Sequence, residues 1–358
     1  MKILIFNWRD IKNTESGGAE VFIHEIAKRW AKKHDVVLFA SNSNGSNVKE
    51  VIDGVKIIRM GGRYSVYSKA KKCYNRHFSK ENFDVIIDVI NTRPFFTPNF
   101  VKNGEKIIAI IFQLAREFWF YETMFPFNVL GYHFLEDRWL KKYRNTPTVT
   151  ISDSTKKDLN DLGFKKVFLA NCGLNTKPID EVEKAGKPII IFLGRMGRAK
   201  KPQDVMKAFK IVKEDVKDAE LWMVGDGFLK KRLESRNMKD VKFFGHVNNK
   251  ARDELVKKAW VIAVPGVREG WGMVVTDANA LGTPAVGYNI HGLRDSIKNG
   301  YNGLSVDNNP EEMAKGIITI LKDSELRERL SKNSVDWARQ FNWDETAKKI
   351  LKVMKDVI

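Results

Sequence analysis

Residues 188–202 read Pro-Ile-Ile-Ile-Phe-Leu-Gly-Arg-Met-Gly-Arg-Ala-Lys-Lys-Pro. The apolar run at 188–193 predicts a buried strand, and apolar residues at helical spacing predict a helix at 203–214. The loop between them carries two glycines, which permit a tight backbone, and four cationic side chains. Free N–H groups at a helix start attract anions, and Arg and Lys neutralise them. The stretch therefore predicts a strand–loop–helix unit with a diphosphate site, and a solvated basic loop is the alternative.

Short apolar strands alternate with helices on both sides of this stretch. That alternation indicates parallel sheets covered on both faces, and the fold class is therefore α/β. Strands are expected at Lys2–Phe6, Val36–Ala40, Val55–Met60, Val85–Ile90, Lys106–Phe112 and Thr148–Ile151, and again at Pro188–Leu193, Leu221–Val224, Val241–Phe244, Val261–Val264, Thr283–Gly287 and Gly303–Val306.

The two runs of strands predict two domains. An N-terminal domain spans 1–174, a C-terminal domain spans 188–342, and a polar linker at about 175–187 joins them. We expect a C-terminal helix at about 343–358 to pack back on the first domain. Because open parallel sheets bind ligands at the carboxyl ends of their strands, we expect two doubly wound, Rossmann-like domains that face a central cleft.

Composition excludes several classes of protein. The 358 residues carry a net charge of +18, and the 43% hydrophobic content excludes a disordered chain. Two cysteines exclude a disulfide framework, and no apolar run is long enough to span a membrane. The charge fits phosphorylated ligands or an anionic membrane; nucleic acid is disfavoured because no recognised module is present. We expect a cytoplasmic protein that can lie on the inner face of the cell membrane, and its oligomeric state stays open.

Further motifs follow strands in both halves. Residues 225–227 (Gly-Asp-Gly) could equally form a turn without a ligand. Glu269 lies in a glycine-bracketed loop before a helix, and Asp277 lies eight residues later. Both carboxylates can accept from sugar or ribose hydroxyls; a helix-start carboxylate and a solvated Asp are the alternative. Residues 16–20 (Ser-Gly-Gly-Ala-Glu) open a helix, where glycines let an anion approach, or simply form a strand–helix turn.

Taken together, these motifs resemble a known family. Gly-Arg-x-x-x-x-Lys at 194–200, Gly-Asp-Gly at 225–227 and Glu-Gly-x-Gly at 269–272, followed by Gly-Thr-Pro at 282–284, look like the donor domain of family 4 retaining glycosyltransferases of the GT-B fold. Gly-Gly-Ala-Glu at 17–20 is similar to the motif that this family places across the cleft. The resemblance covers almost the whole chain.

The resemblance implies a role for each matching residue. Arg195 and Lys200 would contact the donor diphosphate, and Glu269 the hydroxyls of the transferred sugar. Asp277 would take the ribose hydroxyls, although the family has Glu there, so this contact is expected to be altered or bridged by water. The remaining donor-binding positions are Gly17, Gly18, Gly225, Gly227, His246, Val247, Gly270, Trp271, Gly272, Met273 and Val274. No metal or cofactor is expected, and the co-substrate is a UDP- or GDP-linked sugar.

Two loops of the N-terminal half are expected to face the acceptor, namely 88–98 and 112–122. Many family members place a His where Phe112 stands, which puts any His-dependent role in doubt. The candidate acceptor residues in these loops are Asn91, Arg93, Gln113 and Arg116.

Residues 65–82 offer a candidate membrane face. At 100° per residue, four cations form one stripe and three aromatics fall on the opposite side. The stripe either faces water or meets anionic lipid, with exposed aromatics from Phe95–Phe96 or Phe118–Tyr121 at the interface. The cations are Lys69, Lys72, Arg76 and Lys80, and the aromatics are Tyr67, Tyr74 and Phe78.

The sequence thus predicts a retaining, metal-independent hexosyltransferase that acts on a lipid-linked or polysaccharide acceptor at the cytoplasmic membrane face. Two other functions stay open. One is a nucleotide-sugar epimerase or sugar phosphorylase on the same fold, and the other is a non-catalytic nucleotide-sugar binding protein.

Overall fold

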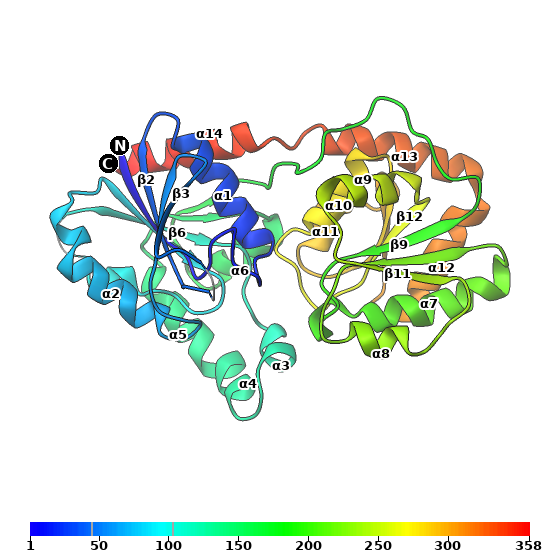
Figure 1. Ribbon diagram of the computed structural model, residues 1–358, viewed down its shortest axis with the longest axis horizontal. Helices are drawn as coiled ribbons and strands as arrows, with labels where there is room; N and C mark the ends of the chain where they lie inside the picture. Colours follow the sequence, from blue (N-terminus) through cyan, green and yellow to red (C-terminus); the bar gives the residue numbers. More distant parts are fainter. Residues whose placement is uncertain (44–45, 102–103) are drawn as a thin grey trace. The chain divides into compact units, whose positions relative to one another are not determined.

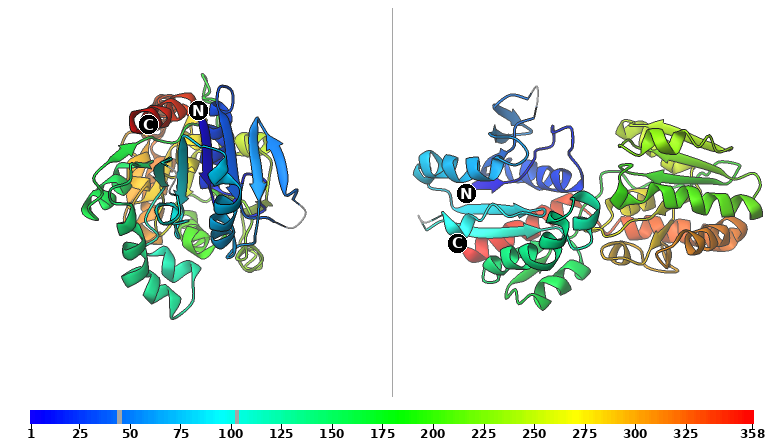
Figure 2. Two further views of the ribbon diagram at one scale, coloured as in Figure 1. Left: turned by 90° about the vertical axis from the view of Figure 1, so that its left-hand side faces the viewer. Right: turned by 90° about the horizontal axis from the view of Figure 1, so that it is seen from below.

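The computed structural model describes residues 1–43, 46–101 and 104–358, which fall into two compact units (Figures 1 and 2). Each unit contains a largely parallel sheet, which confirms the predicted α/β fold class. Unit 1 comprises Met1–Trp119, Phe125–Gly173 and Asn342–Ile358, and unit 2 comprises Phe120–Met124 and Leu174–Phe341. Residues 175–187, where a linker is expected, belong to unit 2.

The sheet of unit 1 has, in the described part of the chain, the strand order β3-β4-β2-β1-β5-β6-β7-β8. Among the described strands, β3 and β4 pair antiparallel and the other neighbours are parallel. The central strands are buried runs of Ile, Val, Leu and Phe, as a sheet covered on both faces requires. The strands are β1 (Lys2–Phe6), β2 (Asp35–Ala40), β3 (Lys49–Ile52), β4 (Val55–Arg59), β5 (Val85–Ile90), β6 (Lys106–Ile111), β7 (Thr148–Thr150) and β8 (Val167–Leu169).

Helices cover both faces of this sheet (Figure 1). The C-terminal helix packs on the first one, because Trp30 Nε1 donates to the Ala347 carbonyl at 3.0 Å and Arg29 pairs with Asp344. The helices of this unit are α1 (Gly18–Trp30), α2 (Val66–Arg76), α4 (Phe127–Leu130), α5 (Glu136–Leu140), α6 (Asp153–Asp161) and α14 (Trp343–Val357). Helix α3 (Phe118–Glu122) begins in unit 1 and ends in the segment assigned to unit 2.

The sheet of unit 2 is parallel throughout and has the order β11-β10-β9-β12-β13-β14. Figure 1 shows α7, α8 and α12 on one face and α9, α10 and α13 on the other. The strands are β9 (Ile189–Leu193), β10 (Glu220–Val224), β11 (Val241–Gly245), β12 (Val261–Val264), β13 (Ala285–Tyr288) and β14 (Gly303–Val306). The helices are α7 (Pro202–Asp215), α8 (Lys230–Glu234), α9 (Asn249–Lys258), α10 (Met273–Ala280), α11 (Leu293–Ser296), α12 (Pro310–Lys322) and α13 (Ser324–Ala338).

The structure corrects the predicted membrane stripe in two respects. Helix α2 ends at Arg76, and Lys80 belongs to a separate 3₁₀ turn, so the four cations are not one helical stripe. Phe95 is buried against Phe6 and Tyr67 and cannot lie at a membrane interface. Lys69, Lys72 and Arg76 remain exposed on α2, whereas Tyr74 and Phe78 enter the core as expected.

A buried carboxylate at the start of β10 gives unit 2 a pH-dependent stability. The hydrogen bond from Lys187 lowers the pKa of Glu220 to about 2, helped by Trp222 and Lys242. Because the folded pKa lies below the unfolded one, this contribution is complete above pH ~4.5 and is lost as the pH falls towards ~2.

We expect Glu220→Gln to lower the free energy of unfolding at pH 7 by about 2 kcal/mol. This is less than the full pKa shift would give, because Lys187 and Lys242 are half exposed and water screens their charges. The difference from wild type should shrink by more than half at pH 3. Urea denaturation at both pH values measures it, with the exposed Glu214→Gln variant as control. An equal loss at both pH values would contradict the assignment.

Candidate functional site

The candidate site of unit 2 lies at the carboxyl ends of its central strands. β9 pairs with β10 on one side and with β12 on the other, and the chain order reverses at this point. Parallel sheets of this order bind ligands in the crevice outside the strand ends at such a switch point. The loop after β9 carries Arg195 and Lys200, and the loop after β12 carries Glu269. The topology therefore brings the three predicted catalytic residues to one edge.

Backbone hydrogen bonds join the loops at this edge. Met196 N donates to the Asp226 carbonyl at 2.7 Å and Leu229 N to the Met196 carbonyl at 3.1 Å. Val267 N donates to the Ala199 carbonyl at 3.0 Å, which joins the loops after β9 and β12. These bonds fix the backbone positions from which the side chains of the loops project.

Gly225 shows why glycine is needed after β10. Its φ is +126°, and an added Cβ would lie 2.0 Å from the Gly194 carbonyl oxygen. At Gly227, with a φ of +152°, an added Cβ would lie 2.6 Å from the Met196 carbonyl oxygen. These predicted donor-site glycines therefore allow two loops to touch through their backbones.

Lys200 and Glu269 form an ion pair across the switch point. The lysine side chain is 38% exposed and that of Glu269 is 13% exposed, so the cation of the pair is accessible and its carboxylate is mostly buried. Glu269 N also donates to the His291 carbonyl at 3.1 Å, which fixes the loop. An accessible cation beside a held carboxylate suits a ligand that has both an anionic group and hydroxyls. Arg195 is exposed in the same loop.

The start of α10 lies directly after Glu269. Gly272, with a φ of +85°, is its N-cap and supplies no side chain, so the first-turn N–H groups lack a side-chain cap. Met273 and Val274 are half-buried in this turn. Trp271, in contrast, is buried against Phe341 with ring centroids 5.2 Å apart. Trp271 is thus a packing residue, and its ring does not support the predicted contact with the donor.

Asp277 is buried inside α10 and bonds within its own unit. Its carboxylate accepts from Asn175 N at 2.9 Å and from Asn175 Nδ2 at 3.0 Å. Burial raises the pKa of Asp277, although both bonds from Asn175 act in the opposite direction. This position does not support the expected ribose contact, because Asp277 would first have to give up both hydrogen bonds from Asn175.

We expect Asp277→Asn to reduce stability more than donor recognition. One carboxylate oxygen becomes an NH₂ group that faces a donor of Asn175, which costs about 1–3 kcal/mol of unfolding free energy. Thermal denaturation without and with a nucleotide sugar separates the two effects. A normal melting temperature with no shift on adding the donor would instead assign Asp277 to the ribose.

The remaining donor positions of unit 2 lie where β11 ends. Gly225 N donates to the Gly245 carbonyl at 2.8 Å, so the ends of β10 and β11 are tied together. His246 is exposed and Val247 is half-buried after this junction. Both are therefore at the same edge as Gly225 and Gly227, as the expected contacts to a base require.

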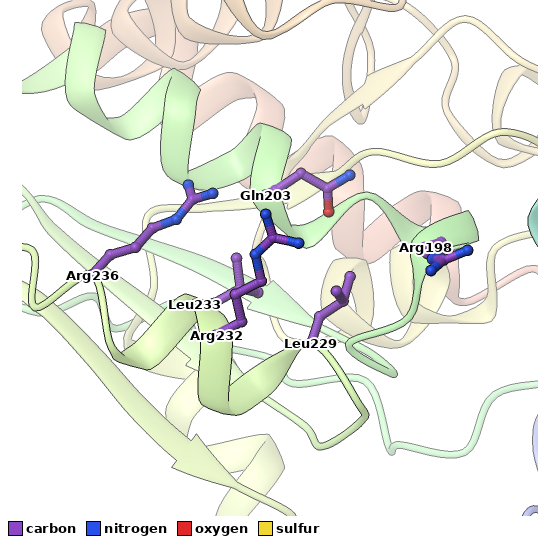
Figure 3. A pocket seen from close by; sticks show the side chains of 6 residues that line it. All are labelled: Arg198, Gln203, Leu229, Arg232, Leu233 and Arg236. Atoms are coloured by element: carbon purple, nitrogen blue, oxygen red, sulfur yellow. The ribbon is translucent and has the colours of Figure 1, made fainter.

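A separate cavity of about 220 Å³ lies between α7 and α8 (Figure 3). Neither Lys200 nor Glu269 lines it, so it is distinct from the ion pair at the switch point. The lining residues are Arg198, Gln203, Leu229, Arg232, Leu233 and Arg236.

In unit 1, the predicted glycine loop opens α1 at the end of β1. Gly17 is the N-cap, and its N–H donates to the buried Glu20 carboxylate at 2.7 Å. Gly18, the first helical residue, is exposed. The Gly17 N–H group is therefore occupied. Because Gly18 is exposed and has no side chain, a ligand can approach the remaining N–H groups of the first turn.

A buried aspartate holds the first acceptor-side loop. Asp88 accepts from Phe95 N at 3.2 Å, from Thr97 N at 3.1 Å and from the Thr97 hydroxyl at 2.9 Å. Burial raises the pKa of Asp88. Asn91 lies in this loop and donates to Asn7 Oδ1 at 3.4 Å, which joins the ends of β5 and β1.

A second buried carboxylate holds the other acceptor-side loop. Glu136 accepts from Ala115 N and from Arg116 N. The Arg116 guanidinium pairs with Asp137 at 2.6 Å, which makes it a structural residue. Sequence reasoning missed Asp88 and Glu136, although an acidic residue inside the apolar run Val-Ile-Ile-Asp-Val-Ile was a signal for the first.

Two further predicted positions have different environments. Gln113 Oε1 is buried at the end of β6 with no hydrogen-bond partner among the described residues. Phe112 is buried and packs on Phe22 with ring centroids 5.2 Å apart. The position where a His is common thus belongs to an aromatic core. Arg93 is exposed above the Tyr67 ring, 4.7 Å from its centroid.

No cluster of three or more His, Cys, Asp or Glu suited to a metal occurs in the described ranges. Within the same part of the chain, none of the helices is long and apolar enough to cross a membrane.

Comparisons with known proteins agree with this geometry. Residues 16–177 match the family described as Glycosyltransferase Family 4, and residues 175–337 match Glycosyl transferases group 1. The D-inositol 3-phosphate glycosyltransferase of Corynebacterium glutamicum is 29% identical over 185 residues, which are 48% of this chain and 44% of that protein. The chain thus spans under half the length of the first curated relatives that it matches.

Solved structures resemble nearly the whole chain. Sucrose-phosphate synthase from Thermosynechococcus elongatus has a TM-score of 0.80 at 17% identity, with 99% of this chain and 98% of that chain covered. Anabaena Alr3699/HepE, solved with UDP and glucose, has a TM-score of 0.72 at 14% identity, with 99% and 100% covered. These likenesses confirm the predicted GT-B fold.

Proposed function

Because the chain belongs to the family 4, group 1 type of glycosyltransferase, we propose that it transfers a hexose-type sugar from a nucleotide-diphosphate sugar to a lipid-linked or polysaccharide acceptor. The observation that carries this proposal is the Lys200–Glu269 pair at the switch point of unit 2. The partly exposed ammonium suits the donor diphosphate, and the carboxylate suits the sugar hydroxyls.

The proposed reaction retains the anomeric configuration. The bond between the anomeric carbon and the phosphate oxygen breaks, and its electron pair leaves with the nucleoside diphosphate. The acceptor oxygen bonds to the same face of that carbon, and its proton passes to the departing phosphate oxygen. Arg195, Lys200 and the uncapped start of α10 stabilise the charge that develops on the diphosphate. Glu269 orients the sugar, and no metal is assigned to the step.

The donor is proposed to be UDP- or GDP-linked. Support comes from the Anabaena relative, which was solved with UDP and glucose. The exposed loop after β11, with His246 and Val247, is the proposed wall for the base. The acceptor side is assigned to the two loops of unit 1 that Asp88 and Glu136 hold, with Asn91, Arg93 and Gln113 as the contacting residues.

A non-catalytic sugar-nucleotide binding protein is the second candidate. Two observations favour it: Phe112 fills the position where a His is common, and Asp277 is engaged by Asn175. It predicts donor binding without donor turnover. An epimerase, in contrast, would convert the donor without an acceptor.

A thermal-shift screen of UDP- and GDP-sugars tests the proposal without knowledge of the acceptor. A donor at about 100 times its Kd stabilises the folded chain by ~2.7 kcal/mol, and the shift identifies base and sugar. The same screen with Lys207→Ala, which changes an exposed lysine of α7, is the control, and its shift should equal that of wild type. Failure of every nucleotide sugar to shift the wild-type chain would refute the proposal.

A further inference from the structure

An extended helical rod in unit 1 exposes large apolar side chains. It begins at Phe125 and runs through α4 (Phe127–Leu130), a π-helical stretch (Gly131–Leu135), α5 and a 3₁₀ turn that ends at Tyr143. Figures 1 and 2 show its α4 end projecting beyond the sheet of unit 1. The rod lies outside the loops assigned to donor and acceptor, so its composition needs another explanation.

The exposed side of the rod begins with four apolar residues. Phe125 is 79% exposed, Phe127 66%, Leu130 43% and Phe134 64%. Gly131, which lies between them, is packed, because an added Cβ there would lie 2.2 Å from the Trp119 ring. Singly exposed apolar residues are ordinary, but several of them on one side of one element mark an interaction surface.

Towards the C-terminal end of the rod, the exposed residues are basic. Arg138, Lys141 and Lys142 are exposed, and no ion pair involves them within the described residues. The acidic residues of the rod are occupied, because Glu136 holds the backbone at Arg116 and Asp137 pairs with the Arg116 guanidinium. The rod therefore presents apolar and cationic groups without competing free carboxylates.

A second basic surface lies across the loop that Asp88 holds. Lys142 lies over the Phe96 ring at 5.1 Å from its centroid. Phe95, which precedes Phe96 in the loop, packs on Tyr67 of α2, with their ring centroids 4.8 Å apart. Helix α2 exposes the cations Lys69, Lys71, Lys72 and Arg76 and has no acidic residue. Both sides of this loop thus favour an anionic partner.

We propose that the exposed face of the rod, Phe125, Phe127, Leu130 and Phe134, inserts into the headgroup region of an anionic lipid bilayer. Arg138, Lys141, Lys142 and the cations of α2 then lie against the lipid phosphates. Apolar side chains at one end of a helical element and cations at the other match the two layers of a membrane surface.

This inference rests on the proposed function and deepens it, because a bilayer-docked enzyme draws its acceptor from the membrane. The acceptor class is then a saccharide or polyol carried on a lipid anchor. The loops with Asn91 and Arg93 adjoin the basic side of the same surface.

Vesicle sedimentation of the full chain tests the docking surface, with vesicles of phosphatidylcholine alone or mixed with phosphatidylglycerol. Wild type should sediment with the mixed vesicles. Phe127→Ser/Phe134→Ser should lower the partition coefficient at least about tenfold, because two exposed phenyl groups no longer leave water. Tyr301→Ser, 40% exposed in unit 2, is the matched control and should bind as wild type does.

A charge variant gives a second readout that does not depend on the aromatic substitutions. Arg138→Glu/Lys141→Glu should abolish the preference for phosphatidylglycerol. Partition that neither double variant changes, or binding independent of phosphatidylglycerol, would overturn the inference. Donor-induced thermal shifts measured in parallel distinguish the two hypotheses. Donor binding without vesicle binding would refute only the docking surface. Vesicle binding without donor binding would refute the proposed transfer.

Discussion

Lys200→Ala lowers turnover by about 10²-fold or more, the usual effect of removing a main transition-state charge contact. The ammonium is the accessible member of the pair with Glu269 at the switch point. Charge grows on the diphosphate as the glycosidic bond breaks, so the loss should appear in kcat more than in the donor KM. Steady-state kinetics with the donor found in the thermal-shift screen measures both constants.

Lys207→Ala is the matched control, since Lys207 is an exposed lysine on α7, seven residues along the chain. Its kcat should equal that of wild type. The melting temperature of Lys200→Ala should change little, because its side chain is 38% exposed. Near-wild-type turnover of Lys200→Ala would refute its catalytic assignment.

Gly225→Ala destabilises unit 2 by about 3 kcal/mol, through strain at positive φ and a backbone clash. The new Cβ would lie 2.0 Å from the Gly194 carbonyl oxygen, and a backbone atom cannot move aside as a side-chain tip can. Since β9 and β10 pair through Val224 and Leu193 just before these glycines, separating the loops also displaces Arg195. Donor-induced thermal stabilisation should therefore fall as well.

Gly186→Ala serves as the control for this variant, because an added Cβ there meets no atom within 4 Å. Urea denaturation should show an unchanged midpoint for Gly186→Ala and a much lower one for Gly225→Ala. Equal midpoints would mean that the contact between the two loops does not constrain the site.

Much of the fold could be predicted because its strands are continuous apolar runs. Lys2–Phe6 and Val85–Ile90 have the predicted bounds. The short strands β3 and β8 were missed, since each is only partly buried and carries a weak apolar pattern. The predicted helix at 65–82 was too long. The helical spacing of its residues continues past Arg76, but the α-helix ends there and a 3₁₀ turn follows at Phe78–Lys80.

The site was predictable where motifs follow strands of one sheet. The loops with Lys200 and Glu269 meet because the carboxyl ends of parallel strands share an edge. The partner of Asp277 was not predictable, since Asn175 lies 102 residues away in the chain. The burial of Phe95 depends in the same way on tertiary packing, here against Phe6 from β1. Sequence motifs identify the loops that are expected to face a ligand, but they do not show which side chains of those loops are buried.

Transfer of labelled sugar tests the central claim most directly. The full chain is incubated with the labelled nucleotide sugar that the thermal-shift screen selects and with a membrane lipid extract as acceptor. We expect release of the nucleoside diphosphate together with label in the lipid fraction, in the anomeric configuration of the donor, and loss of both with Lys200→Ala. Label that remains in the nucleotide sugar, or a product of inverted configuration, would contradict it.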